Sequence, residues 1–338
     1  MRRDLLGHPP NPITQPPPPA TRPGAPPRKG TSVSTTRSIT ADRSGPITID
    51  ASLLGHGGTI TVRAAADCER ATLTITTTDQ DGPAADAVRD ATLRSDHGLV
   101  ANVQGKGDTG GTTVITGSGR GTHVVQNFGT VTGRVVGLQI GGNVVGGNIN
   151  VGGGDVFVNG VRVSGQNATI IQGSAPIEIT ATVPEGSSLL ARTHSADVRA
   201  EGAILNVSAH TQSGDVTTGH AAKVTASTQS GDVRVEKAAH INAKTQSGSL
   251  RLGRTDVVEG SSMSGDITIS DFGGTAHLKN MSGDIRIHAT AGGDITASTM
   301  SGDVTVTATQ DALTDDLNVQ ANSMSGRVNT PPRRPGNA

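Results

Sequence analysis

The second half of the chain alternates apolar and polar positions in short runs. Val233 and Val235 flank Arg234, for example, and the same order of apolar, polar and apolar positions returns at 267–269. Alternation with a period of two predicts β-strands that bury one face and expose the other.

Each of these runs follows a Ser-Gly-Asp turn, and this turn recurs eight times between residues 183 and 330, with one of its three residues replaced in three of the repeats. Successive turn centres are 17 to 19 residues apart, except for a last interval of 24. Apolar residues occupy the positions seven before and two after the centre, and Thr, Ser or Asn lies three before it. A short fixed period with apolar columns is typical of stacked repeats. The turn centres are Ala196, which replaces glycine, and Gly214, Gly231, Gly248, Gly265, Gly283, Gly302 and Gly326.

Each repeat is therefore predicted to form a strand, the Ser-Gly-Asp turn, a second strand and a looser connection. One such unit cannot bury its apolar face alone, so neighbouring units must stack, with strands about 4.8 Å apart. We expect an all-β fold, a β-solenoid of the β-helix or β-roll kind with coils of 17–18 residues. The Ser and Gly residues suit the turn, and the inward Thr/Ser/Asn column suits a hydrogen-bonded ladder.

The repeats resemble a known family in their recurring sequence motif and its spacing, as in TQSGDV at 211–216 and TMSGDV at 299–304. They are similar to the bacterial putative-adhesin repeat family of unknown function, over about residues 183–330. The resemblance implies a β-solenoid-like fold and an adhesive role. It implies no functional residues, and the chain departs from an adhesin in showing no secretion signal.

Composition changes along the chain and divides it into five segments. Residues 46–106 alternate again and predict a small β-domain, with helical potential at 84–96. The proposed segments are a disordered, Pro-rich basic lead at 1–45, the small β-domain at 46–106, a Gly-rich β segment at 107–182, the eight-unit solenoid at 183–330 and a disordered tail at 331–338.

The Gly-rich segment has two interpretations. Its regularly spaced Val and Ile residues, with few charges, favour narrower solenoid coils with glycine at the corners. Alternatively, LQIGGN at 138–143 has high β-propensity, low charge and no proline, as amyloid-forming segments do. It resembles short amyloid signalling motifs, so 127–150 is the candidate region for nucleating assembly.

Global composition excludes several classes of protein. The net charge is −1, which gives no indication of nucleic-acid binding, and the single Cys68 excludes an internal disulfide framework. The N-terminus lacks the apolar run of a signal peptide, and no stretch approaches 18 apolar residues. These features predict a cytoplasmic protein without a transmembrane segment, and unconventional export is the remaining route to a surface.

The candidate chemistry lies in the carboxylate that follows six of the eight turn centres, a column that is interrupted by Ser249 and ended by Arg327. Stacked carboxylates repel one another by about 1 kcal/mol in water, and a divalent cation would relieve this repulsion. Aspartate is also a preferred turn residue in its own right, and the period is about twice that of calcium-binding β-rolls. We therefore predict no metal site, and keep the column as the candidate cation ridge. Its members are Asp197, Asp215, Asp232, Asp266, Asp284 and Asp303.

A second column changes character partway along the repeats, two positions before the turn centre. It begins with His194 and continues with glutamine in three repeats before methionine replaces it. This change predicts a surface ridge that becomes more apolar, as a docking edge or as a strip covered by the terminal segments. The methionines are Met263, Met281, Met300 and Met324.

No catalytic residue or cofactor site is predicted, since no nucleophile elbow, phosphate-binding loop or metal-binding histidine spacing occurs. The sequence indicates a non-catalytic scaffold that presents a rigid, adhesin-like surface to an unknown macromolecule or to a second copy of itself. The alternative is a signalling protein that assembles through 127–150.

Overall fold

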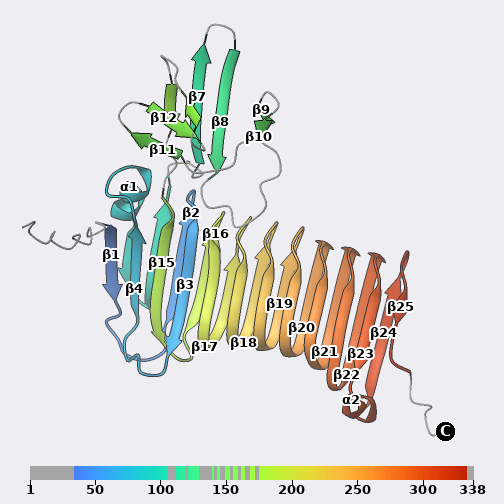
Figure 1. Ribbon diagram of the computed structural model, residues 1–338. Coiled ribbons are helices and arrows are strands. Elements are labelled where there is room, and N and C mark those ends of the chain that lie inside the picture. Colours follow the sequence, from blue (N-terminus) through green and yellow to red (C-terminus); the bar gives the residue numbers. More distant parts are fainter. Residues whose placement is uncertain are drawn as a thin grey trace, which may run out of the picture. The chain divides into compact units, whose positions relative to one another are not determined.

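The computed structural model describes residues 34–105 and 175–332, together with separate strands between 111 and 171. The described chain is almost entirely β, which confirms the predicted all-β stacked fold (Figure 1). Its two helices are α1 (Pro83–Asp90) and α2 (Gln310–Thr314). Neither helix is long and apolar enough to cross a membrane.

The repeats form long strands that stack in parallel. Each long strand bends at its middle, so that its first half pairs with the first half of the next long strand and its second half with the second half. The strands of this region are β16 (Ser188–Thr193), β17 (Asp197–His210), β18 (Val216–Thr228), β19 (Val233–Thr245), β20 (Leu250–Ser264), β21 (Ile267–Ser282), β22 (Ile285–Ser301), β23 (Val304–Ala308), β24 (Leu317–Ser323) and β25 (Val328–Asn329).

One coil runs from a bend to the next bend and contains one Ser-Gly-Asp turn. We call the side of the stack with these turns the turn edge, and the side with the bends, such as 219–223 in β18, the arch edge. Strand halves that follow a turn form one layer, and strand halves that precede a turn form the other. Register shifts fall at the arch edge, between Ala200 and Ala203 and between Thr255 and Val257, for example.

The strands expected to form a small β-domain at 46–106 pair into the same sheet as the repeats. They include β2 (Thr48–Leu54), β3 (Gly58–Ala65) and β6 (Gly98–Gln104), while β15 (Ile177–Pro184) begins the segment after the Gly-rich region. β2 pairs in parallel with both β6 and β16, and β3 pairs with both β15 and β17. β2 and β3 therefore form one coil, and β6 and β15 form another. The coil of β2 and β3 lies next to the first repeat and separates it from the coil of β6 and β15, although β6 follows β3 in the chain.

Antiparallel strands and a helix close the N-terminal end of the stack. β1 (Thr35–Thr40) and β4 (Thr72–Thr77) extend the first layer, and β5 (Thr92–Ser95) extends the second. Helix α1 buries its alanines and Val88 at this end. The Arg37 guanidinium fixes the end of the helix by donating to the carbonyl oxygens of Arg89 (2.7 Å) and Ala91 (2.5 Å).

The Gly-rich segment differs from the expected solenoid coils. Its described strands pair antiparallel, and parallel stacking resumes only at β15. Asn159–Gly160 separates β12 from β13, and a two-residue Asn-Gly link favours a hairpin over a coil. The strands are β7 (Gly111–Ser118), β8 (Gly121–Phe128), β9 (Gln139–Ile140), β10 (Asn143–Val144), β11 (Ile149–Gly152), β12 (Asp155–Val158), β13 (Val161–Val163) and β14 (Ala168–Ile171).

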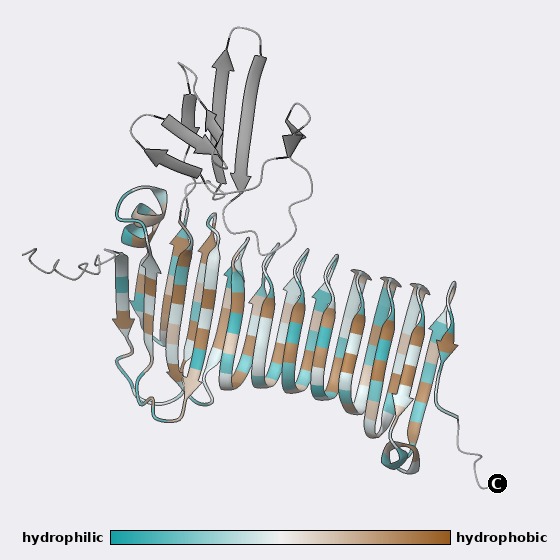
Figure 2. Cartoon of the chain, viewed as in Figure 1, coloured by the Kyte–Doolittle hydropathy of each residue, from teal (hydrophilic) through white to brown (hydrophobic). Residues whose placement is uncertain are grey.

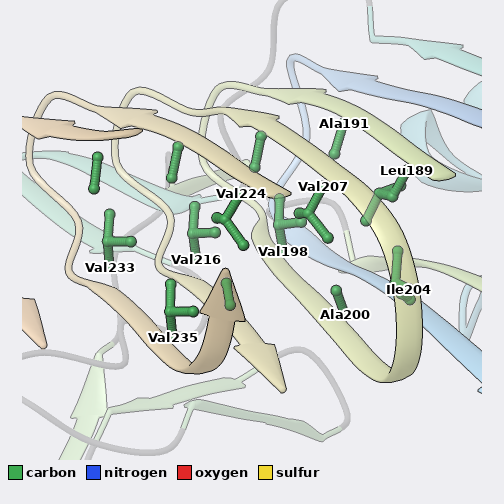
Figure 3. Packing of buried hydrophobic residues seen from close by; sticks show 14 of the residues in the cluster. Leu189, Ala191, Val198, Ala200, Ile204, Val207, Val216, Val224, Val233 and Val235 are labelled. Carbon is green, nitrogen blue, oxygen red and sulfur yellow. The ribbon is translucent and has the colours of Figure 1, made fainter. Parts of the chain in front are cut away.

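The core lies between the two layers and consists of small and branched aliphatic side chains. Hydrophobic positions alternate along the strands of the repeats (Figure 2), and Val198 and Val207 enter the interior from opposite halves of β17 (Figure 3). Packing is adjusted locally, because Gly260 leaves the space that Leu278 of the next coil occupies; a Cβ at Gly260 would lie 2.8 Å from Leu278 Cδ2. Such a core is narrow and continuous along the stack.

Residues 311–318 contain most of α2 and the start of β24. Thr309 begins this helix, because its Oγ1 accepts the N–H of Ala312 (3.2 Å), and Ala312 is buried. The helix packs against β22, within the connection that joins β23 to β24. It thereby fills the arch edge of the last repeat, where the interval between turns is longest.

Candidate binding surfaces

The Ser-Gly-Asp turn is held together by the Thr residue three positions before its centre. In the repeat around Gly248, Thr245 Oγ1 accepts the Gly248 N–H (2.9 Å) and donates to the Gly231 carbonyl oxygen of the preceding coil (3.3 Å). The same pair of bonds recurs at Thr228. The predicted ladder of this column therefore exists, but it runs through backbone groups of the turns and not from one side chain to the next.

The aspartate column connects successive coils through backbone N–H groups. Asp215 N–H donates to Asp197 Oδ1 (3.0 Å), and Asp232 N–H donates to Asp215 Oδ1 (2.9 Å). At the interruption, Ser249 N–H donates to Asp232 Oδ1 (2.8 Å). The same contact joins Asp284 to Asp266, Asp303 to Asp284 and Arg327 to Asp303. Each of these carboxylates accepts a charge-assisted hydrogen bond that ties its own coil to the next one.

Arginines on the layer that follows the turns form ion pairs with several aspartates of the column. Arg251 contacts Asp232 (2.7 Å), and Arg286 contacts both Asp266 (3.2 Å) and Asp284 (2.5 Å). Sequence reasoning missed these partners, although arginine recurs three positions after several turn centres, a signal that the repeat alignment contains. The carboxylates that formed the candidate cation ridge thus interact with N–H donors and guanidinium groups. In the described residues, no three His, Cys, Asp or Glu side chains gather as a metal-binding group.

The last aspartate of the column, Asp303, has an altered acidity. The backbone N–H of Arg327 and then its guanidinium group hold the pKa of the Asp303 carboxyl below its ordinary value of 3.8, because both stabilise the charged form. No Asp, Glu, Lys or Arg side chain is buried in the described segments. The Asp, Glu, Lys and Arg side chains of the stack therefore lie at its surface, where they can contact a partner.

The layer that precedes the turns presents a flat polar surface, which we call the polar face. Nine parallel pairings join ten strands from β6 to β24, and the register of these strand halves is unbroken. At about 4.8 Å a step, the face extends over about 43 Å. Its outward side chains from β17 to β24 are half-buried or exposed: Ser208, His210, Thr225, Ser227, Asn242, Lys244, Glu259, Ser261, His277, Lys279, Thr296, Ser298, Gln320 and Asn322.

A shallow groove of about 460 Å³ lies at the arch edge over β17 to β20. Small alanines, such as Ala222 and Ala239, line it, and the basic side chains of His220, Lys237 and Arg254 stack along one row. Asp256 also lines the groove, so its charges are mixed. This groove adds a second exposed surface to the stack, at the arch edge and not at the turn edge.

The methionine column lies at the turn edge and is exposed, as the change from glutamine to methionine predicted. The exposed fractions of Met263, Met281 and Met300 are 50, 47 and 50%, and that of Met324 is 76%. These side chains point away from the core, so they stabilise none of the interior packing. The alternative assembly region at 127–150 lies mostly outside the described residues, and its role stays a prediction.

Comparison with known proteins gave distant matches only. No family model and no curated protein matches the chain. Three solved structures share a description with the family that the repeats resemble. Putative adhesins from Parabacteroides distasonis and Parabacteroides merdae are each 8% identical, with TM-scores of 0.31 and 0.30, covering 89% of this chain and 98% of theirs. A putative adhesin from Bacteroides fragilis is 12% identical, with a TM-score of 0.31, covering 88% of this chain and 97% of its own. Likeness at this level carries no argument about function.

Proposed function

We propose that this protein is a non-catalytic binding scaffold whose polar face engages an extended polysaccharide. The observation that supports this proposal is the unbroken register of the face, which repeats the same kinds of polar side chain at intervals of about 4.8 Å. A sugar unit in an extended chain has a comparable length. A polymer lying along the stack would therefore meet an equivalent set of donors and acceptors at each coil.

The chemistry of the face favours a polysaccharide over a protein partner. Protein interfaces depend on buried aromatic, Met and Arg anchors, and charged groups are depleted from their centres. The outward side chains that define the face carry Ser, Thr, Asn, Gln, Lys, His and one Glu, with no Phe, Tyr or Trp among them. Such groups bind hydroxyl and carboxylate groups by hydrogen bonds. Single-stranded nucleic acid is disfavoured for a related reason, because the face has no Phe, Tyr or Trp ring on which a base could stack.

Rigidity supports the same role. Each strand half in the middle of the face is hydrogen-bonded on both sides, and the Thr and Asp columns add bonds between coils at the turn edge. A surface that is ordered before binding loses little conformational entropy when its partner arrives. Weak individual hydrogen bonds can then add up along several coils.

A glycan array probed with the full-length protein tests the proposal. We expect binding to extended polysaccharides, and the double variant Lys244→Ala/Lys279→Ala should weaken it about a hundredfold or more, because hydrogen bonds to charged groups contribute about 1.5–3 kcal/mol each. The matched control is Arg234→Ala/Lys237→Ala, which removes the same charge from the other layer and the arch edge. It should bind within about twofold of the original protein.

Two results would overturn the proposal. One is an array without any bound polysaccharide while circular dichroism shows an intact β-rich protein. The other is an equal loss of affinity in both double variants, which would assign the binding to net charge and not to the polar face.

A further inference from the structure

The four methionines of the repeats lie directly above one another on successive coils. Ser262 pairs with Asn280 and Ser264 pairs with Ser282, which places Met263 beside Met281 between them. In the same way, the pairings of Asn280 with Thr299 and of Ser282 with Ser301 place Met281 beside Met300. The Met324 N–H donates to the Thr299 carbonyl oxygen (3.3 Å), so Met324 continues the column.

Apolar character alone does not explain the choice of methionine. The chain contains five methionines, of which one is Met1 and the other four all occupy this column. Among the described residues the core contains Val, Ile, Leu, Ala and Phe272, and each of the four methionines is about half exposed or more. What methionine offers beyond leucine at an exposed position is a flexible side chain that ends in a thioether sulfur.

We propose that the methionine column binds a soft monovalent cation, Cu(I) or Ag(I), through thioether sulfurs of adjacent coils. Thioethers are soft ligands that select Cu(I) among biological metals, and they bind Ca²⁺ and Mg²⁺ poorly. The binding step is ligand coordination without electron transfer, and a thioether has no proton to lose. The site is distinct from the aspartate column, whose carboxylates interact with N–H groups and arginines.

The geometry of the stack brings the ligands together. Neighbouring methionines have backbones about 4.8 Å apart, and three rotatable bonds let two sulfurs converge on one ion. Methionines separated by three coils are about 14 Å apart along the stack, too far to share an ion. Adjacency is therefore the property on which binding depends, and it can be varied without changing the number of methionines.

Methyl-labelled methionine provides a direct readout. In the full chain carrying Cys68→Ser, which removes the one thiol, the methyl carbons of five methionines give a simple NMR spectrum. Titration with Ag(I), which requires no reductant, should shift the four column resonances and leave that of Met1 unmoved. Titration with Ca²⁺ should shift none. Unmoved column resonances in the Ag(I) titration would overturn the proposal.

Two double variants test whether adjacency matters. Met263→Leu/Met324→Leu keeps the neighbouring pair Met281 and Met300, whereas Met281→Leu/Met300→Leu keeps two methionines that are not neighbours. Leucine preserves size and apolarity, and the positions are outside the core, so both variants should fold. We expect Ag(I) affinity at least about tenfold higher in the variant with the adjacent pair. Equal affinities would show that each thioether binds alone and would refute the shared site.

Discussion

Replacing threonine by valine at two buried positions should change stability in opposite directions. Thr245 is 5% exposed and its hydroxyl accepts the buried Gly248 N–H and donates to the Gly231 carbonyl oxygen. Thr218 is 1% exposed, and its Oγ1 is a buried atom without a hydrogen-bond partner in the described structure. The two substitutions are chemically identical, so the difference between them isolates the hydrogen bonds.

The expected magnitudes follow from these contacts. Thr245→Val leaves a buried N–H without an acceptor, which should lower the free energy of unfolding by about 1–3 kcal/mol. Thr218→Val removes a hydroxyl that is buried without compensation and adds a methyl group to an interior position. It should raise the free energy of unfolding by about 1 kcal/mol. Valine fits this column, since Val235 occupies the same position in the next coil.

Urea unfolding followed by circular dichroism measures the difference, through the midpoint and the slope of each transition. Because repeat arrays can unfold in stages, amide hydrogen exchange of Gly248 provides a local measurement, and Thr245→Val should accelerate it. The control is Thr245→Ser, which keeps the hydroxyl as Ser262 does in the next coil, and should cost roughly the 0.8 kcal/mol of one methyl group. A Thr245→Val protein as stable as the original protein would refute the reasoning, and so would a Thr218→Val protein less stable than the original.

Two further predictions concern the turn edge. Gly231→Ala would place a Cβ 2.0 Å from the Gly214 carbonyl oxygen, so the strands must separate. We expect the free energy of unfolding in urea to fall by about 3 kcal/mol or more. The control is Gly57→Ala, because a Cβ at Gly57 meets nothing within 4 Å. Asp303 should titrate by NMR below its ordinary pKa of 3.8, so its contribution to stability is complete above that value and is lost as the pH falls through the lower folded-state pKa. Arg327→Ala should raise the Asp303 pKa only part of the way, because the backbone N–H remains as a donor; a full return to the ordinary value would contradict this account.

The repeat columns read from the sequence coincide with the hydrogen-bonded register. Val216 pairs with Val233, and Val233 pairs with Leu250, as the alignment on turn glycines requires. In a parallel stack, residues one period apart lie side by side, so every column of the alignment becomes a row of contacts. For this reason the strands, the turns, the buried Thr column and the exposed methionines could all be predicted from one sequence.

The partners of the aspartates were harder to predict. A carboxylate after a glycine is compatible with a turn residue or a cation ligand, and only the structure shows that its oxygen accepts the N–H of the next coil. The helical potential at 84–96 was correct only in part. Helix α1 ends at Asp90, and Thr92–Ser95 becomes β5 because it pairs with β6 and extends the sheet, which overrides local helix propensity.

The sequence by itself determined the period, the identity of the inward and outward columns and the location of the turns, because these depend on alternation and on residues close in the chain. Tertiary structure alone decided the order of coils at the N-terminal end. There Thr48 of β2 pairs with Ser188 of β16, and β2 separates β16 from β6. Pairing between segments so far apart depends on complementary apolar faces that many arrangements could bury, and no local pattern distinguishes among them.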